Sequence, residues 1–544
     1  MWLGLWMLVA PAEACGGLVC DAVQPVVQEG ERVVFEIDGE AGVVEMHVQV
    51  AYEGPAEDFG WIVPVGGEPE LFVSPQFLFD TLGPATSPTF VMNQVDEGNC
   101  RDQSRRLRLT GVASFDQSAG ESGLEPPPAT VISQAEVGPY DATILRAQTT
   151  TALRTFLDDN AYAIPTELDT VLEPYVTDEA YFVAIKLRKD RSAGDIAPLG
   201  LRYPGTKASI PIQLTAIAVA DDMPLEVYVF GDTRTVPESY LHVKINEAAV
   251  DWWLGGVNYF DVVRRAADEA GGQAFATDYY GAPPARTSEI PSDLTFRLRN
   301  APSREQWAEA VASGLGVFLD PGAFSVIADL LDISPFYTLD DFRSCPGCVL
   351  DPTEDPFDPE ALTTAFEEEL LLDLVRSLEL FDAPLVTRLT SSLSADEMTV
   401  DPVFVLNADM RDELVDNVRT ADLVTECRPN RRRWKARRRL DLADGRSLRL
   451  PSTEDLGFGE ELDFLSEQGV IAAQVIERTA ATGMPVVEVD FTVELEELAD
   501  RHNRSVGRGC AGWRGCSTTD PAGLGATSLL LALVVARRRR RTPV

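Results

Sequence analysis

The residues from Val44 to Tyr52 alternate between apolar and polar side chains, and this run constrains the fold more than any other stretch. In a β-strand, successive side chains point to opposite faces, so a period of two assigns each residue to one face. One face then carries Val44, Met46, Val48, Val50 and Tyr52, and the other carries Glu45, His47 and Gln49. The pattern predicts a strand with its first face in a core and its second in water, which makes His47 a surface histidine.

A second alternating run precedes this strand and completes a hairpin. Val33, Phe35 and Ile37 occupy every second position, and the residues Asp-Gly-Glu-Ala-Gly at 38–42 separate the two runs. Glycine readily adopts the backbone conformations that a tight connection requires. We therefore expect the two runs to pair as antiparallel strands.

Four further segments carry a resemblance to a known family. They read GPAEDFGWIVPV at 54–65, VGPYD at 137–141, FVAIKL at 182–187 and DYYG at 278–281. Together with the hairpin they resemble an uncharacterised bacterial envelope family, domain of unknown function 2330, over roughly the first half of the chain. The resemblance implies an envelope protein and no particular chemistry, because no activity is assigned to the family.

The charge of the chain excludes one class of partner. The 544 residues include 46 basic and 87 acidic side chains, for a formal net charge of −41. Nucleic acid binding depends on lysine and arginine neutralising phosphates, so we expect no nucleic acid partner. The acidic excess is explained by a solvated surface, and weak calcium binding by carboxylate-rich loops is the alternative.

Strand-like and helix-like segments follow one another without a regular βαβ period, which is typical of an α+β fold. Strands are expected at 181–187, 214–220 and 225–230, and a helix at 358–380 whose apolar residues recur every four positions. The predicted divisions are a signal peptide at 1–14, a β-rich family domain with interspersed helices at 15–282, a helix-richer region with a few strands at 283–505, a linker with a cysteine motif at 506–520, a transmembrane sorting helix at 521–536 and a basic cytoplasmic tail at 537–544.

The first residues have the pattern of a secretory signal. An apolar run at 2–10 is followed by Ala12-Glu13-Ala14, which has the small-x-small form of a cleavage site and would leave Cys15 first. The basic residues that usually begin such a signal are missing. Lipidation of Cys15 and a buried N-terminal helix are the alternatives.

The last residues have the pattern of a membrane-inserted sorting tail. The apolar run at 521–536 would reach about 24 Å as a helix, slightly short of the ~30 Å hydrocarbon core. It is followed by the five residues Arg537, Arg538, Arg539, Arg540 and Arg541, which would stop transfer and stay cytoplasmic. With Gly515 and Cys516 upstream, this tail is similar to the sorting signals of myxobacterial surface proteins. That resemblance implies a sorting protease, cleavage near the cysteine and lipid attachment at Cys516, whereas a permanent single-pass anchor is the alternative.

Eight cysteines fit an exported chain, where disulfides form. The shortest loops would be closed by Cys15 with Cys20 and by Cys345 with Cys348. The latter two also have the spacing of a redox dithiol, but the residues after Cys348 do not begin a helix of the kind that such a site uses. Half of a metal site is a further alternative for this pair.

The sequence contains no legible active site. Only His47, His242 and His502 are present, far apart, and no zinc, nucleotide-binding or nucleophile-elbow motif occurs. The acidic run at 351–360 could offer oxygens to calcium but lacks the spacing of an EF-hand loop. The basic run at 428–439 could pair with the protein's own carboxylates or with an anionic polymer or lipid surface. We assign no catalytic, cofactor-binding or metal-binding residue.

These observations favour an exported, surface-anchored protein that acts as a non-enzymatic binding or structural module of the envelope. The membrane is its expected partner through the tail, and the sequence identifies no protein or polysaccharide partner. An envelope hydrolase whose catalytic residues come together only in space is the alternative, because such a triad leaves no linear trace.

Overall fold

The computed structural model describes most of the chain between residues 27 and 506. The described ranges are 27–39, 41–53, 60–98, 130–160, 162, 168–176, 180–188, 196–286, 288–350, 357–427, 437–450 and 471–506. Within them the protein is a strand-rich α+β fold with several sheets, as the sequence predicts.

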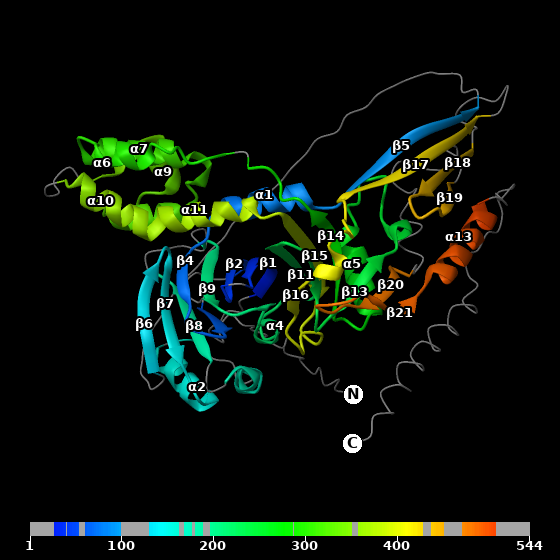
Figure 1. Ribbon diagram of the computed structural model, residues 1–544, viewed down its shortest axis with the longest axis horizontal. Helices are drawn as coiled ribbons and strands as arrows, with labels where there is room; N and C mark the ends of the chain where they lie inside the picture. The colour runs from blue at the N-terminus through cyan, green and yellow to red at the C-terminus, as the bar shows by residue number, and fades with distance from the viewer. Residues whose placement is uncertain are drawn as a thin grey trace, which may run out of the picture.

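A mixed sheet of ten described strands lies at the centre of the molecule (Figure 1). Its order is β21 (Val486–Asp490), β20 (Ala473–Arg478), β13 (Leu241–Ile245), β14 (Ala274–Gly281), β15 (Leu385–Leu393), β11 (Met223–Gly231), β1 (Val27–Asp38), β2 (Val43–Glu53), β9 (Leu199–Pro204) and β4 (Glu70–Val73). Among the described strands of this sheet, the parallel pairs are β1 with β11 and β13 with β14. Strands from both sides of the predicted boundary at residue 282 share this sheet, so that boundary does not separate two independent sheets.

The predicted hairpin is confirmed. β1 pairs with β2 antiparallel, and Val33 lies opposite Val48 and Phe35 opposite Met46. In the connection, Ala41 N donates to Asp38 Oδ1 at 2.8 Å, and Gly42 has a φ of +66° that favours glycine. The apolar face of the hairpin is buried, and the Phe35 ring contacts Phe404 of β16 (Val403–Asn407).

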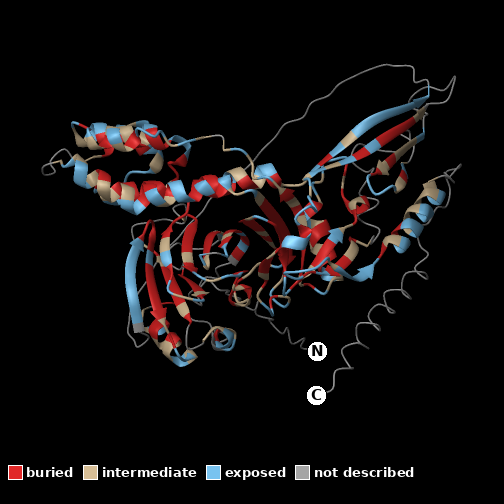
Figure 2. Cartoon of the chain, in the orientation of Figure 1, coloured by how far each residue is buried: buried red, intermediate tan, exposed pale blue. Residues whose placement is uncertain are grey.

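The prediction that the polar face of the hairpin is wet is wrong for Glu45 and His47, whereas Gln49 on the same face is partly exposed. Glu45 is 5% exposed and His47 is fully buried, although the alternation itself is as predicted. Helices cover this face: α1 (Gln76–Thr86) reaches it through Gln76, and α11 (Leu372–Glu379) reaches it through Asp373. Figure 2 shows most of the central strands coloured as buried.

Three smaller sheets surround the central one in the described residues. The first contains β3 (Gly60–Val65), β8 (Tyr181–Leu187), β7 (Tyr140–Arg146) and β6 (Thr130–Val137). The second contains β19 (Ser447–Leu450), β18 (Arg437–Leu442), β17 (Val418–Cys427) and β5 (Thr89–Gly98), and its β5–β17 pair extends away from the centre in Figure 1. The third contains β10 (Ala208–Ser209), β16 and β12 (Arg234–Pro237).

Most of the helices between residues 294 and 379 gather in a lobe at the upper left of Figure 1. They are α6 (Leu294–Arg299), α7 (Arg304–Leu315), α8 (Pro321–Leu330), α9 (Leu339–Ser344), α10 (Pro359–Phe366) and α11. The remaining described α-helices are α2 (Thr150–Asp159), α3 (Leu168–Leu172), α4 (Ile212–Thr215), α5 (Tyr259–Glu269) and α13 (Thr492–Val506).

The helix expected at 358–380 is present, with a π-helical segment at Glu367–Leu371 between α10 and α11. Phe366, Leu370, Leu374 and Leu378 of the predicted stripe are all buried. Four residues exceed one 3.6-residue turn, so a four-residue stripe rotates around an ideal α-helix. The wider π turns take up part of that rotation and keep the stripe directed at the core.

Two further expectations concern single segments. The strand expected at 214–220 is wrong, because α4 occupies its beginning and the Asp401 carboxylate accepts a hydrogen bond from the Gln213 backbone N–H at 3.1 Å. The transmembrane sorting helix at 521–536 lies outside the described residues. In the part of the chain that is described, no helix is long and apolar enough to cross a membrane.

Candidate functional site

The face of the central sheet that carries His47 is charged across several strands. Residues paired in register share a face, so Glu226, Arg32 and Gln49 form one row across β11, β1 and β2. The next row runs from Arg388 of β15 through Tyr228 and Val34 to His47. A third row pairs Glu36 with Glu45, Glu45 with Arg202 and Arg202 with Glu70. We call these rows the charged face.

A buried ion network lies at one end of the charged face. Arg388 is 1% exposed, and its Nε lies 3.1 Å from Asp278 Oδ2 while its Nη2 lies 3.2 Å from Glu226 Oε1. Its Nη1 also donates to Gly83 O at 3.1 Å and to Ser87 Oγ at 2.6 Å, at the end of α1. Arg388 is therefore fixed on every side.

Asp278 at the centre of this network is fully buried. It accepts a hydrogen bond from Thr390 Oγ1 at 2.5 Å and another from the Tyr259 hydroxyl of α5. Burial raises the pKa of Asp278, although Arg388 and these two hydroxyls oppose the rise. Asp278 begins the DYYG segment on which the family resemblance partly rests, and the structure gives it this internal role.

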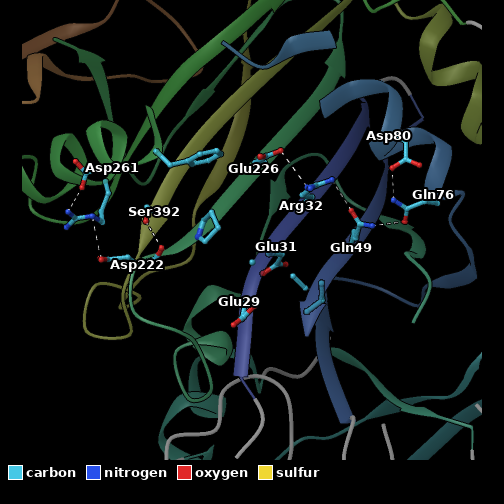
Figure 3. Close-up of a pocket in the computed structure, with 16 residues that line it drawn as sticks. Glu29, Glu31, Arg32, Gln49, Gln76, Asp80, Asp222, Glu226, Asp261 and Ser392 are labelled. Atoms are coloured by element: carbon cyan, nitrogen blue, oxygen red, sulfur yellow. Dashed lines mark hydrogen bonds and ion pairs between the residues drawn. The ribbon is translucent and has the colours of Figure 1, made fainter. Parts of the chain in front are cut away.

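A cleft of about 950 Å³ opens over the charged face between α1 and α5 (Figure 3). Its floor includes a row of small residues, with Ser392 opposite Pro224 and Gly30 opposite Ala51. Side chains this short leave the space above the strands unfilled. The row of Glu226, Arg32 and Gln49 borders that floor, Gln76 and Asp80 come from α1, and Phe260, Asp261 and Arg264 come from α5.

The cleft is predominantly acidic. Its lining includes two arginines, Arg32 and Arg264, and six acidic residues, Glu29, Glu31, Asp80, Asp222, Glu226 and Asp261. Arg264 is held on α5, because its Nη2 lies 2.7 Å from Asp261 Oδ1 and its Nη1 lies 3.4 Å from Asp268 Oδ2. Hydrogen bonding to Asp261 raises the pKa of Arg264. The exposed ring of Phe260 adds an apolar surface to the wall.

Glu31 differs from the other cleft carboxyl groups. Its register partners are Leu225 and Val50, so strand alternation directs its side chain toward the apolar face. It is 4% exposed and accepts a hydrogen bond from Gln28 Nε2 at 2.9 Å. Burial raises the pKa of Glu31 to about 7, with Gln28 acting in the opposite direction.

The charged face also contains a serine, a histidine and a glutamate in the order of a catalytic triad. His47 Nδ1 lies 2.9 Å from Ser74 Oγ, and His47 Nε2 lies 3.1 Å from Glu45 Oε1. Arg202 Nε donates to Glu45 Oε2 at 2.7 Å. Burial acts to raise the pKa of Glu45, but hydrogen bonds from His47 and Arg202 outweigh it and lower that pKa.

Ser74 has no exposed surface, and neither does His47. A serine nucleophile must reach a substrate carbonyl, which a sealed hydroxyl does not. This cluster therefore works as a buried hydrogen-bonded network that joins β2 to the start of α1.

His242 forms a second buried pair of the same kind. Its Nδ1 lies 2.9 Å from Glu477 Oε1, and its Nε2 lies 2.9 Å from Thr277 Oγ1. Burial lowers the pKa of His242. His502, on α13, contacts the Arg449 carbonyl at 2.8 Å. In the described part of the chain, no group of three or more histidine, cysteine, aspartate or glutamate side chains is placed to hold a metal ion.

Two of the cysteines singled out in the sequence are described. Cys345 and Cys348 are joined by a disulfide, next to the end of α9. The other sequence-predicted site residues lie outside the described ranges. They are Cys15, Cys20, Gly515, Cys516, Arg537, Arg538, Arg539, Arg540 and Arg541.

The two charge runs are described only in part. From the acidic run, Asp358 accepts hydrogen bonds at the start of α10, and Glu360 pairs with Arg299. From the basic run, Arg439 pairs with Glu97 at 2.7 Å, Asp441 at 3.0 Å and Glu426 at 3.1 Å. Asp358, Glu360 and Arg439 are thus engaged with the protein itself.

Sequence reasoning missed the cleft and the ion network. Arg32 and Glu226 sit in alternating strands, where polar residues read as solvent-facing positions, and Arg388 follows an apolar run without any motif. The available signal was the DYYG segment, because an aspartate inside a strand of apolar neighbours requires a buried partner.

Comparison with known proteins yields one match. A family model described as an uncharacterised protein conserved in bacteria, DUF2330, matches residues 9–297, just over half of the chain. No curated protein and no solved structure matches the chain.

Proposed function

The chain belongs to the DUF2330 family of uncharacterised bacterial proteins, and from that premise we propose that it is a binding protein of the cell envelope whose ligand occupies the cleft between α1 and α5. The cleft volume of about 950 Å³ carries this proposal, since ligand pockets typically enclose about 300–1,000 Å³. Membership itself contributes no activity.

The construction of the cleft supports a binding role. Its charged side chains come largely from helices and strands. Glu226 is held by an ion pair with Arg388 and by a hydrogen bond from the Tyr228 hydroxyl at 2.5 Å. A side chain fixed in advance loses little conformational freedom when a ligand arrives. The small residues of the floor leave room for that ligand.

A matched pair of substitutions tests the proposal. Ala51→Trp would fill the cleft from its exposed floor, whereas Ala361→Trp changes an exposed alanine of α10 by the same amount. Thermal shift with spermidine, N-acetyl-lysine methylamide, glutamate and glucose should identify a stabilising compound. Its effect should disappear in Ala51→Trp and persist in Ala361→Trp. Equal effects in both variants would contradict a site in the cleft.

We also propose that the protein is exported and sorted to the cell surface through Gly515, Cys516 and the arginines at 537–541. The Cys345–Cys348 disulfide supports export, because disulfides persist in oxidising compartments. Mass spectrometry of the surface fraction should find Cys15 at the amino terminus and no peptides from residues 529–537. Recovery of those peptides at the surface would show that the tail is a permanent anchor and is not cleaved. In the Cys516→Ala variant, the uncleaved protein should remain in the inner membrane.

An envelope hydrolase is a second candidate, favoured by the Ser74–His47–Glu45 cluster. As in a serine hydrolase triad, the histidine lies between hydroxyl and carboxylate, but its ring is reversed, with Nδ1 toward Ser74 and Nε2 toward Glu45. The burial of Ser74 opposes it, so binding is the preferred function. Labelling of Ser74 by a serine-directed reagent separates the two functions.

A further inference from the structure

Glu226 is the point where the buried ion network meets the cleft. On the buried side, Arg388 Nη2 lies 3.2 Å from its Oε1. On the cleft side, Arg32 Nε lies 3.8 Å from its Oε2, which also accepts a hydrogen bond from the Tyr228 hydroxyl. The Glu226 carboxylate therefore has two cationic partners: Arg388 in the buried network and Arg32 at the cleft.

The two arginines are held very differently. The Arg388 side chain is 2% exposed and makes several contacts shorter than 3.3 Å. The Arg32 side chain is 45% exposed, and within the described residues it makes a 3.8 Å ion pair with Glu226 and a 3.4 Å hydrogen bond to Gln49 (Figure 3). Ion pairs with an exposed partner contribute little to stability, so Arg32 can leave Glu226 at little cost.

We propose that the cleft ligand carries an amine or guanidinium cation on an alkyl stem, and that this cation displaces Arg32 and pairs with Glu226. The proposal rests on the binding function assigned to the cleft. Arg32 thus occupies the position of the ligand cation: it pairs with Glu226 when the cleft is empty and becomes solvated when the cleft is filled.

Three features of the cleft select this ligand class. Five acidic residues against two arginines, leaving aside Glu31 because its side chain is directed toward the apolar face, make the cleft attractive to cations. Phe260 and Pro224 offer apolar surface for a methylene stem, and an aromatic face also attracts cations. Arg388 stays in place during the exchange because Asp278 and the end of α1 hold it, so Glu226 keeps its position for the incoming group.

Titration calorimetry on the full chain tests the exchange. The probes are spermidine, as a free alkylamine, and N-acetyl-lysine methylamide, as an amine presented on a peptide backbone. Arg32→Gln should tighten binding of the accepted probe by about five-fold, because it removes the competing cation. Glu226→Gln should weaken binding by at least about ten-fold, because it removes the acceptor.

Arg264→Gln is the matched control, since it removes the same charge from the other wall of the cleft. Long-range attraction would make both arginine variants bind the probes equally more tightly, and added salt would abolish both gains. Displacement of Arg32 predicts that the affinity for the probe increases more in Arg32→Gln than in Arg264→Gln. This increase should persist in 0.5 M salt, where the screening length is only about 4 Å. Arg32→Gln lies on an exposed side chain and leaves the buried network intact.

Several outcomes overturn the inference. One is weaker probe binding in Arg32→Gln, and another is an equal increase in affinity in the two arginine variants. A third is that neither cationic probe binds at millimolar concentration. If glutamate or glucose binds instead and Ala51→Trp abolishes that binding, the proposed function stands and this inference fails. If cation binding survives in Ala51→Trp, the cleft assignment itself fails.

Discussion

The two faces of the central sheet differ by a single step along each strand. On one face, Leu389, Val227, Val33, Val48 and Leu199 form a row across five strands, and all are almost fully buried. On the other, the neighbouring row consists of Arg388, Tyr228, Val34, His47 and Gly200. The apolar row stabilises the fold through area removed from water.

The charged face does not gain stability in the same way. Burying ions costs several kcal/mol each, and apolar residues of similar volume are often as stable or more so. Both faces are nevertheless buried for most of their extent. The difference suggests that the apolar face holds the sheet together, whereas the charged face is kept for what it places in the cleft.

Val48→Asp should be the most disruptive change to the apolar face. It places a carboxylate with no partner among buried aliphatic side chains, which we expect to cost more than about 5 kcal/mol and to prevent folding. Gln49→Asp, one residue further on the charged face and beside Arg32, should cost less than about 1 kcal/mol. Circular dichroism melts of the two variants measure this contrast. Equal melting shifts would show that the faces are assigned wrongly.

Arg388→Met should be the most disruptive change to the charged face. It leaves Asp278 and Glu226 without their common partner, and breaking a buried pair in this way costs about 4 kcal/mol. Adding Asp278→Leu removes one stranded charge and should restore about half of the loss. Urea unfolding gives both values. A double variant that is less stable than Arg388→Met would mean that Asp278 contributes independently of the ion pair.

Glu31 is a carboxyl group on the otherwise apolar face, and it makes the stability of the protein depend on pH. The pKa of Glu31 is about 7 when folded, above the ordinary 4.5, so the folded protein prefers the protonated group. Ionisation of the buried Glu31 therefore does not destabilise the protein below about pH 4.5. The destabilisation grows as the pH rises and reaches about 3 kcal/mol near pH 7. Glu31→Gln should be more stable than the natural chain at pH 8 and equally stable at pH 4. A difference that does not change between these pH values would contradict burial as the cause.

The sequence predicts the apolar face and not the charged one, for a physical reason. The period of two in β1 and β2 is local, and it assigns Val33 and Val48 to a core without any knowledge of the rest of the chain. Whether the opposite face is wet depends on helices elsewhere. His47 is hydrogen-bonded to Ser74, which lies just before α1, and Arg202 is hydrogen-bonded to Asp373 of α11.

The cleft depends on longer-range placement still. Arg32, Glu226 and Arg388 come from three strands far apart in the chain, and only their register brings them together. The helices α1 and α5 then leave the floor between them open. Polar residues at alternating positions give no sign of which of them will be sealed and which will face a ligand.

Ser74→Ala should give the smallest effect and decide between a sealed network and a triad. The change removes one hydrogen bond to His47 and should cost about 1 kcal/mol, much less than the loss of Arg388. Because Ser74 has no exposed surface, a fluorophosphonate reagent should leave it unlabelled in the native chain. A hydrolase would instead show stoichiometric labelling at Ser74 that disappears in His47→Gln, since the histidine would activate the hydroxyl. That labelling would assign the active chemistry to the Ser74–His47–Glu45 cluster instead of the open cleft, and it would require the buried Ser74 hydroxyl to become accessible in solution.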